Sequence, residues 1–211
     1  SKSLVDISAV KTDTDWFDEA LTSHKSAAGL IIGDNGMELL ILTEHEKVKD
    51  GDLKVRFYDY TEAAGTLKKY DSNTGLAVIS VNLSDVDSST REVISYAELG
   101  SSKSLRSGQP VIVVGNPTGS NGSLLFGNLT SVTQTAELYD SSYNILTTDI
   151  LKSSNGSGVV ADWSGKIIGL LQEKTEVEGQ DNTIQAYGIS DVKDLIEHLS
   201  NNQDIVYMGI V

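Results

Sequence analysis

Short apolar segments recur along the whole chain, and they constrain its fold more than any other feature. Each has the length of a β-strand and is bounded by turn residues, such as those at 34–36 and 164–165. The segments lie at residues 4–10, 29–33, 39–42, 53–58, 76–81, 110–114, 124–129, 144–147, 158–161, 166–171 and 183–189. This spacing predicts an all-β barrel or sandwich.

One segment near the C-terminus departs from this pattern. It begins at Ser190, a residue type favoured at helix N-caps. The apolar residues that follow at helical spacing are Val192, Leu195, Ile196 and Leu199. We therefore expect a C-terminal helix of about ten residues that packs one face on the barrel.

Serine and aspartate residues interrupt the strand pattern between positions 81 and 107. This interruption predicts two β-barrel halves, approximately at residues 1–100 and 101–200. The last residues, 201–211, begin with a polar link and become apolar after Asp204. From the pattern alone, this tail is equally the first strand of a further domain or the last strand of the same one.

The charge of the chain bears on its partners. There are 16 Lys and Arg residues against 30 Asp and Glu residues, so the formal net charge is −14. Such a chain repels nucleic-acid phosphates and anionic lipid surfaces, and we expect no nucleic-acid partner. No apolar run approaches the ~20 residues that a membrane-spanning helix needs. A membrane anchor is expected only upstream of residue 1.

The sequence gives no support to metal or cofactor chemistry. His24, His45 and His198 are the only histidines, they are far apart, and there is no cysteine. We therefore expect no metal site. The glycine-rich segment 115–122 lacks the lysine and the strand-to-helix context of a phosphate loop, so a tight turn is the better interpretation. We expect no cofactor.

A serine flanked by glycines is the most informative local motif. Ser157 stands between Gly156 and Gly158, just before the expected strands at 158–161 and 166–171. Small flanking residues let backbone amides converge on a developing oxyanion while the hydroxyl points into a cleft, which acyl transfer by a serine requires. On its own, however, this tripeptide is a common turn.

Several segments, in the same order along the chain, resemble the HtrA (DegP-like) family of trypsin-fold serine proteases. The most specific block is 105–117, which is similar to that family's Leu-Arg-x-Gly-x-x-Val-x-Ala-Ile-Gly-Asn-Pro. The other similar blocks are 28–32, 40–43, 74–78, 148–149, 166–169, 184–189 and 207–211. The resemblance implies a trypsin-like double six-stranded β-barrel with a C-terminal helix. It also implies that 201–211 is a linker and the first residues of a truncated PDZ domain.

When the family's three catalytic positions are aligned with this chain, only the nucleophile position holds the residue type that the family has. Ser157 falls at the nucleophile position, but its oxyanion loop, with Asn155 and Gly156, has a different residue order. Glu46 falls at the position of the general base, and Gly75 falls at the position of the acid. A carboxylate is a weak base for a hydroxyl, and glycine has no side chain to orient an imidazole.

His45 stands one residue before the aligned base position, and it offers an alternative. A one-residue bulge would let His45 act as the base, with Asp71 or another acid reaching in. The other interpretation is that His45 is a rim or surface residue among charged neighbours.

Three functions follow from these observations. We expect a degenerate protease domain, retained as a peptide-binding or scaffolding module for polypeptide ligands. The alternative is an active serine endopeptidase that uses Ser157 with His45 in a shifted geometry. A third hypothesis is a structural domain that only positions a PDZ domain, and it would have no peptide groove.

The resemblance also implies a setting and an assembly. Family members suggest an extracytoplasmic location, in the cell envelope or secreted, with an anchor if one precedes the chain. They also suggest a homotrimer formed through N-terminal aromatic residues, for which Trp16 and Phe17 are candidates. A hydrophobic plug inside their own chain is the favoured interpretation of these two residues.

Overall fold

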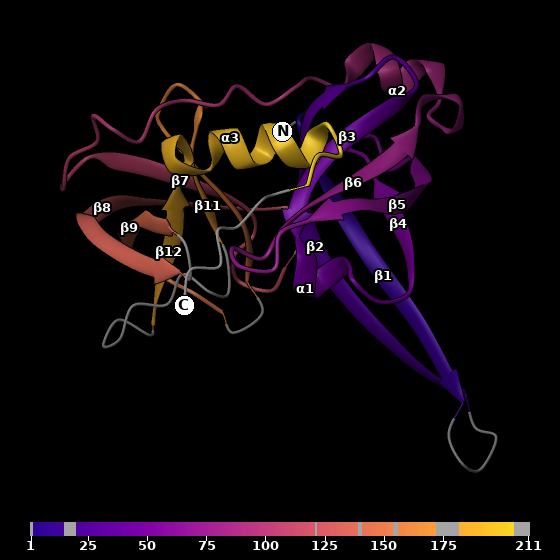
Figure 1. The fold of residues 1–211 in the computed structure, drawn as a ribbon, viewed down its shortest axis with the longest axis horizontal. Helices are drawn as coiled ribbons and strands as arrows, with labels where there is room; N and C mark the ends of the chain where they lie inside the picture. Colours follow the sequence, from indigo (N-terminus) through magenta and orange to yellow (C-terminus); the bar gives the residue numbers. More distant parts are fainter. Residues whose placement is uncertain are drawn as a thin grey trace.

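The structure is a computed structural model that describes residues 2–14, 20–120, 122–138, 141–153, 156–171 and 182–204. It contains two closed barrels of six antiparallel strands each, with a C-terminal helix lying over them (Figure 1). The predicted all-β double barrel with a C-terminal helix is therefore confirmed.

The first barrel has the strand order β1-β2-β3-β6-β5-β4. Its strands are β1 (Leu4–Thr14), β2 (Ala20–Asp34), β3 (Glu38–Glu44), β4 (Asp52–Arg56), β5 (Glu62–Tyr70) and β6 (Leu76–Asn82). Because successive side chains of a strand point to opposite faces, every second residue points into the barrel. Ile31, Ile41 and Ile79 are completely buried in this way.

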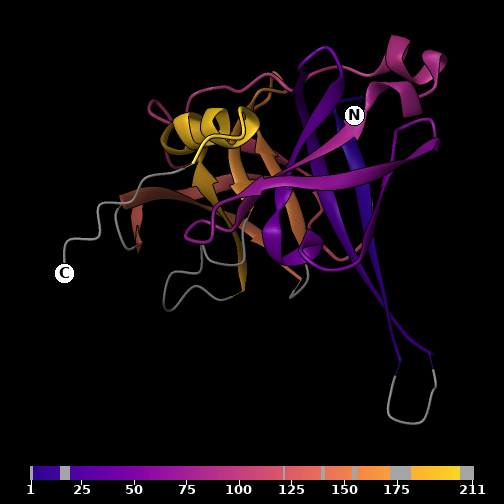
Figure 2. The same cartoon turned by 45° about the vertical axis from the view of Figure 1, so that its right-hand side comes forward.

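Strands β1 and β2 continue beyond the barrel as a long hairpin. Their pairing runs from Leu4 with Leu30 to Thr14 with Ala20. Figures 1 and 2 show this hairpin as the indigo arm that projects away from the rest of the molecule. Trp16 and Phe17, the expected assembly residues, lie outside the described residues.

The second barrel has the strand order β10-β11-β12-β9-β8-β7. Its strands are β7 (Pro110–Asn116), β8 (Ser123–Leu138), β9 (Ser141–Leu151), β10 (Ser157–Ala161), β11 (Ile167–Leu171) and β12 (Thr183–Gly188). Val111, Val113 and Val160 are completely buried in its interior. Gly115 and Asn116, which the sequence assigns to a glycine-rich turn, are the last residues of β7, and residues 117–120 and 122 after them form turns.

Helix α3 (Ile189–Ser200) covers the seam between the barrels. Its buried residues are Ile189, Val192, Leu195, Ile196 and Leu199, which include all four predicted positions. The predicted N-cap is wrong, because Gly188 occupies the N-cap and Ser190 is already helical. The Ser190 hydroxyl instead accepts a hydrogen bond from the Ser102 amide at 2.8 Å, which ties the helix to the linker between the barrels.

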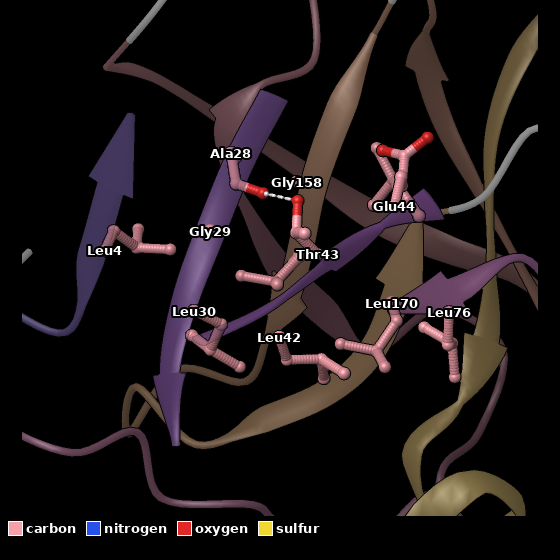
Figure 3. Close-up of a pocket in the computed structure, with 12 residues that line it drawn as sticks. Leu4, Ala28, Gly29, Leu30, Leu42, Thr43, Glu44, Leu76, Gly158 and Leu170 are labelled. Carbon is pink, nitrogen blue, oxygen red and sulfur yellow. Dashed lines mark hydrogen bonds between the residues drawn. The ribbon is translucent and has the colours of Figure 1, made fainter. Parts of the chain in front are cut away.

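Three short helical segments complete the described connections: α1 (His45–Val48), η1 (Leu83–Asp85) and α2 (Ser88–Val93). Helix α1 follows β3 directly and packs on β1 and β2 of the first barrel. The seam itself is apolar in its interior, where Leu30 and Leu42 of the first barrel pack against Val159 and Leu170 of the second. Figure 3 shows the side chains of Leu30, Leu42 and Leu170 around a small pocket.

Candidate functional site

Ser157 is the first residue of β10, and its side chain crosses the seam. The residue is completely buried. Its hydroxyl oxygen accepts a hydrogen bond of 2.9 Å from the backbone amide of Ala28 on β2. Beside it on β7, Asn116 is paired with Ser157 and donates from Nδ2 to the Ser26 hydroxyl at 3.2 Å. Two hydrogen bonds from the second barrel therefore hold the same stretch of β2.

Ala28 is also bound from within the first barrel. The Thr43 hydroxyl on β3 donates to the Ala28 carbonyl at 3.0 Å (Figure 3). Both backbone groups of Ala28 thus have buried side-chain partners, one from each barrel. Buried backbone groups need such partners, because leaving one unsatisfied is costly. The position of Ser157 is accordingly fixed by the packing of the seam.

His45 and Gly75 are neighbours through their backbones. His45 is the first residue of α1, and its amide donates to the Gly75 carbonyl at 2.8 Å. The imidazole of His45 stacks on the Tyr70 ring, with centroids 3.8 Å apart and planes inclined by 5°. The structure therefore joins the segments predicted to carry base and acid. The imidazole of His45 is stacked on the Tyr70 ring. The hydroxyl of Ser157 is instead hydrogen-bonded to the Ala28 amide.

Glu46, at the aligned base position, forms an ion pair with Lys49 one turn later on the chain, at 2.7 Å. The hydrogen bond from Lys49 is the main reason that the pKa of Glu46 lies below its usual value. A carboxylate with a lowered pKa is ionised and holds protons weakly near neutral pH. It is therefore poorly suited to take a proton from a serine.

Asp71, the alternative acid, is buried and stabilises its own turn. Its carboxylate accepts hydrogen bonds from the Thr74 amide at 2.8 Å and the Thr74 hydroxyl at 2.6 Å. Its backbone carbonyl accepts from the Gly75 amide at 2.9 Å. Asp71 thus shapes the turn on which Gly75 stands.

The oxyanion loop is described only in part. Asn155 lies outside the described residues. Gly156 donates from its amide to the Ser153 carbonyl at 3.0 Å, and Ser153 donates in turn to the Pro117 carbonyl at 3.2 Å. These contacts dock the loop against the turn that follows β7.

An open pocket of about 390 Å³ lies on the seam, next to this loop. Its lining is polar and comes from β2, α1, the end of β7 and the oxyanion loop. The lining residues are His24, Lys25, Ser26, Glu46, Lys47, Asn116, Gly119 and Ser153. Of the predicted site residues, Glu46 lines this pocket, whereas Ser157 and His45 are not among its described lining residues.

From the sequence alone, His24 is considered only as a possible metal ligand, and Asn116 is placed in a turn. Both reach the pocket because long-range strand pairing brings their strands to the seam. Asn116 could have been identified as a site residue from the sequence, because it lies in the 105–117 block that resembles the protease family. His24 has none, because its position depends on how far the β1–β2 hairpin extends.

Hydroxyl, amide and ammonium groups in this pocket suit the donors and acceptors of a polypeptide backbone. Within the described ranges, no group of three or more His, Cys, Asp or Glu side chains is placed to hold a metal ion. Among the same residues, no helix has the length and apolar character to cross a bilayer.

Comparisons with known proteins agree with this architecture. Residues 27–170 match the family described as "Trypsin-like peptidase domain". "Serine protease Do-like HtrA" of Bacillus subtilis (strain 168) is 29% identical over 199 residues, which cover 90% of this chain and 43% of that protein. "Serine protease HtrA-like" of Staphylococcus aureus (strain MRSA252) is 25% identical over 194 residues, covering 87% of this chain and 24% of that protein.

Solved structures show the same fold. Two structures of the HtrA-type protease AlgW with decapeptide superpose on this chain with TM-scores of 0.74 and 0.72, at 16% and 17% identity. Each match covers 95% of this chain, and 64% and 65% of the AlgW chains. The chain therefore spans less than half the length of the two curated relatives above and about two thirds of the AlgW chains.

Proposed function

Because this chain belongs to the trypsin-like peptidase family, we propose that its HtrA-like domain binds polypeptide at the seam between the barrels without cleaving it. The observation that carries the proposal is the environment of Ser157. Its hydroxyl is completely buried and accepts the Ala28 amide proton. A serine nucleophile needs access to the substrate carbonyl and an adjacent base.

The neighbouring positions support the same proposal. His45 stacks on Tyr70, Glu46 pairs with Lys49, and Gly75 offers no carboxylate. In serine proteases, loss of a single triad member lowers turnover by about 10⁴-fold or more. Two unsuitable positions are therefore enough to reduce hydrolysis below detection.

Peptide binding is proposed from the polar pocket that lies next to the oxyanion loop. AlgW, which shares this fold, has been solved with a decapeptide. A domain that served only to position another domain would not need this pocket. We therefore favour a peptide-binding or scaffolding role over a purely structural one.

The first experiment tests hydrolysis. The purified chain is incubated with casein and, separately, with a fluorophosphonate probe, using trypsin as the positive control. We expect no cleavage above background and no labelling of Ser157. Stoichiometric labelling that disappears in Ser157→Ala would overturn the proposal and establish the alternative, an active endopeptidase using Ser157 with His45.

The second experiment tests binding at the pocket, with fluorescein-labelled casein followed by fluorescence anisotropy. His24→Ala removes an exposed side chain that lines the pocket, and His198→Ala is the matched control on α3. We expect saturable binding that His24→Ala weakens and His198→Ala leaves unchanged. Absence of saturable binding would refute the peptide-binding role.

Three further properties are proposed from the family. The relatives are longer than this chain, which supports a PDZ domain following residue 211 in the full protein. The HtrA relationship supports an extracytoplasmic location and a homotrimer. Sedimentation velocity of the purified chain tests the trimer, and a single monomeric species at high concentration would contradict it.

A further inference from the structure

Five large apolar side chains are exposed on one continuous part of the surface, which we call the aromatic strip. They are Tyr58 (49% exposed), Tyr60 (80%), Leu124 (51%), Phe126 (63%) and Trp163 (68%). Single exposed apolar residues are ordinary, but a contiguous group of this kind marks an interaction surface. Tyrosine and tryptophan are also the residues that contribute most to binding at protein interfaces.

The strip contains a groove of about 250 Å³. Tyr58 and Tyr60, which follow β4, line one part of it, and Leu124 of β8 lines another. Phe126 lies two residues further along β8, on the same face as Leu124. Its ring contacts Trp163 in the turn after β10, with centroids 5.9 Å apart. The groove therefore continues from the first barrel onto the second.

Tyr60 is held in a conformation that a bulky residue rarely adopts. Its φ angle is 67°, in the left-handed region where glycine is favoured. Its amide donates to the Phe57 carbonyl at 3.0 Å, and the Phe57 amide donates to the Thr61 carbonyl at 2.9 Å. These bonds close a tight turn that presents the Tyr60 ring to solvent.

This turn is also anchored from outside. Asp59 accepts hydrogen bonds from the Thr61 hydroxyl at 2.7 Å and from the buried Thr90 hydroxyl of α2 at 2.6 Å. These two bonds, with that from Thr90 the larger, lower the pKa of Asp59 and keep it anionic. A rigid platform loses little conformational entropy when it binds a partner.

The net charge of the chain and the tyrosine rings of the strip favour a cationic partner, whereas the charged groups described beside the strip do not. The ammonium group of Lys2 already lies 5.9 Å from the centre of the Tyr58 ring, a cation–π arrangement. Asp6 and Arg56, the charged residues of the groove, neutralise each other in an ion pair of 2.7 Å. The chain as a whole carries a net charge of −14, which attracts basic segments over longer distances.

We propose that the aromatic strip is a docking surface for a polypeptide segment of a partner protein that carries lysine or arginine beside apolar residues. The apolar residues would occupy the groove, and the cations would lie over the tyrosine faces. The groove shares no described lining residue with the pocket next to the oxyanion loop. This surface is therefore additional to the proposed function and does not depend on it.

The experiment uses a fluorescein-labelled decapeptide of alternating leucine and lysine, titrated with the chain and followed by anisotropy. Tyr60→Ser and Trp163→Ser are compared with Met37→Ser, whose side chain is 74% exposed in the turn between β2 and β3. All three side chains are exposed, so the variants should fold. We expect Tyr60→Ser and Trp163→Ser each to weaken binding about tenfold, with no change for Met37→Ser.

Two companion peptides separate charge from apolar contact. One alternates leucine with glutamate and the other alternates serine with lysine, and we expect both to bind at least about tenfold more weakly. Equal binding of either peptide would overturn the proposal. So would equal affinities of Tyr60→Ser and Met37→Ser. Self-association in sedimentation that disappears in Tyr60→Ser would also overturn it, because the occupant would then be a second copy of the chain.

Discussion

The two barrels meet at one seam but bring different features to it. The second barrel brings Ser157, whose hydroxyl reaches across to the Ala28 amide. The first barrel brings α1 and the turn before β6, joined by the hydrogen bond from His45 to Gly75. Both barrels thus keep the backbone arrangement of a peptidase fold. Under the proposed function, the first lacks side chains that would activate a serine, so packing would maintain the framework of the site without its chemistry.

The largest effect is expected inside the second barrel, where β10 and β7 approach closely beside Ser157. Gly158 has a φ angle of 147°, and a Cβ atom there would lie 2.3 Å from the Val114 carbonyl oxygen. We expect Gly158→Ala to lower the free energy of unfolding by about 3 kcal/mol or more in urea denaturation.

Gly108→Ala is the matched control for this prediction. Gly108 also has a positive φ angle, 84°, but a Cβ atom there would meet nothing within 4 Å. We expect it to lose only about 1 kcal/mol, from backbone strain alone. Equal losses in the two variants would mean that β10 and β7 are not closely packed beside Ser157.

The next effect concerns Ser157 itself. Ser157→Ala leaves the buried Ala28 amide without its partner, so we expect a loss of about 1 to 3 kcal/mol in the free energy of unfolding. Ser164→Ala, in an exposed turn, is the control and should change it by no more than about 0.5 kcal/mol. If the two variants were equally stable, Ser157 would be free for chemistry and the contrast between the barrels would weaken.

Much of the fold could be predicted from the sequence because its strands and its last helix bury apolar residues at regular spacing. Strand β5 (Glu62–Tyr70) was not predicted, since Ala63 is its only fully buried apolar residue. Strands β2 and β8 extend beyond their apolar segments for a different reason. Their added residues pair with neighbouring strands through backbone hydrogen bonds, which do not require apolar side chains and so cannot be predicted from hydropathy.

The site was less predictable than the fold. Its local feature, a serine between glycines before a hairpin, was readable from the sequence. The hydrogen-bond partner of that serine, Ala28, lies 129 residues earlier in the chain. A local sequence pattern cannot predict a hydrogen bond between residues so far apart. The stacking of His45 on Tyr70 likewise depends on how α1 meets the end of β5.

A gain of function would sharpen the comparison further. Glu46→His together with Gly75→Asp supplies an imidazole and a carboxylate at the two positions that the alignment assigns to the base and the acid. We expect slow labelling of Ser157 by a fluorophosphonate in the double variant, and none in either single variant. Full turnover also needs converging amides, and loss of one oxyanion donor costs about 10² to 10³ in rate.

Peptide mapping after labelling, with Ser157→Ala in the same background, identifies the modified residue. A crystal structure that shows the new side chains at 46 and 75 pointing away from Ser157 would refute the alignment, whatever the labelling result. Labelling of the Glu46→His variant alone would mean that Asp71 or another acid already orients the introduced imidazole.

The smallest effect is expected for the ion pair between Glu46 and Lys49. Lys49 lowers the pKa of Glu46, so the pair stabilises the folded state above the ordinary carboxyl pKa, and this contribution disappears as the pH falls through the lowered value. Solvent screens it, because the side chains of Lys49 and Glu46 are 37% and 46% exposed. We expect Glu46→Gln to cost at most about 0.5 kcal/mol at pH 7.

Urea denaturation of the Glu46→Gln variant at pH 7 and near pH 3 provides the measurement. The difference from the unsubstituted chain should be small at pH 7 and should decrease at the acidic pH, as Glu46 becomes protonated in the folded state. Lys49→Met should show the same loss at pH 7, since either substitution removes the same pair. A much larger loss for Glu46→Gln than for Lys49→Met would mean that Glu46 has a second role at the seam. The first barrel would then contribute a working carboxylate to the site after all.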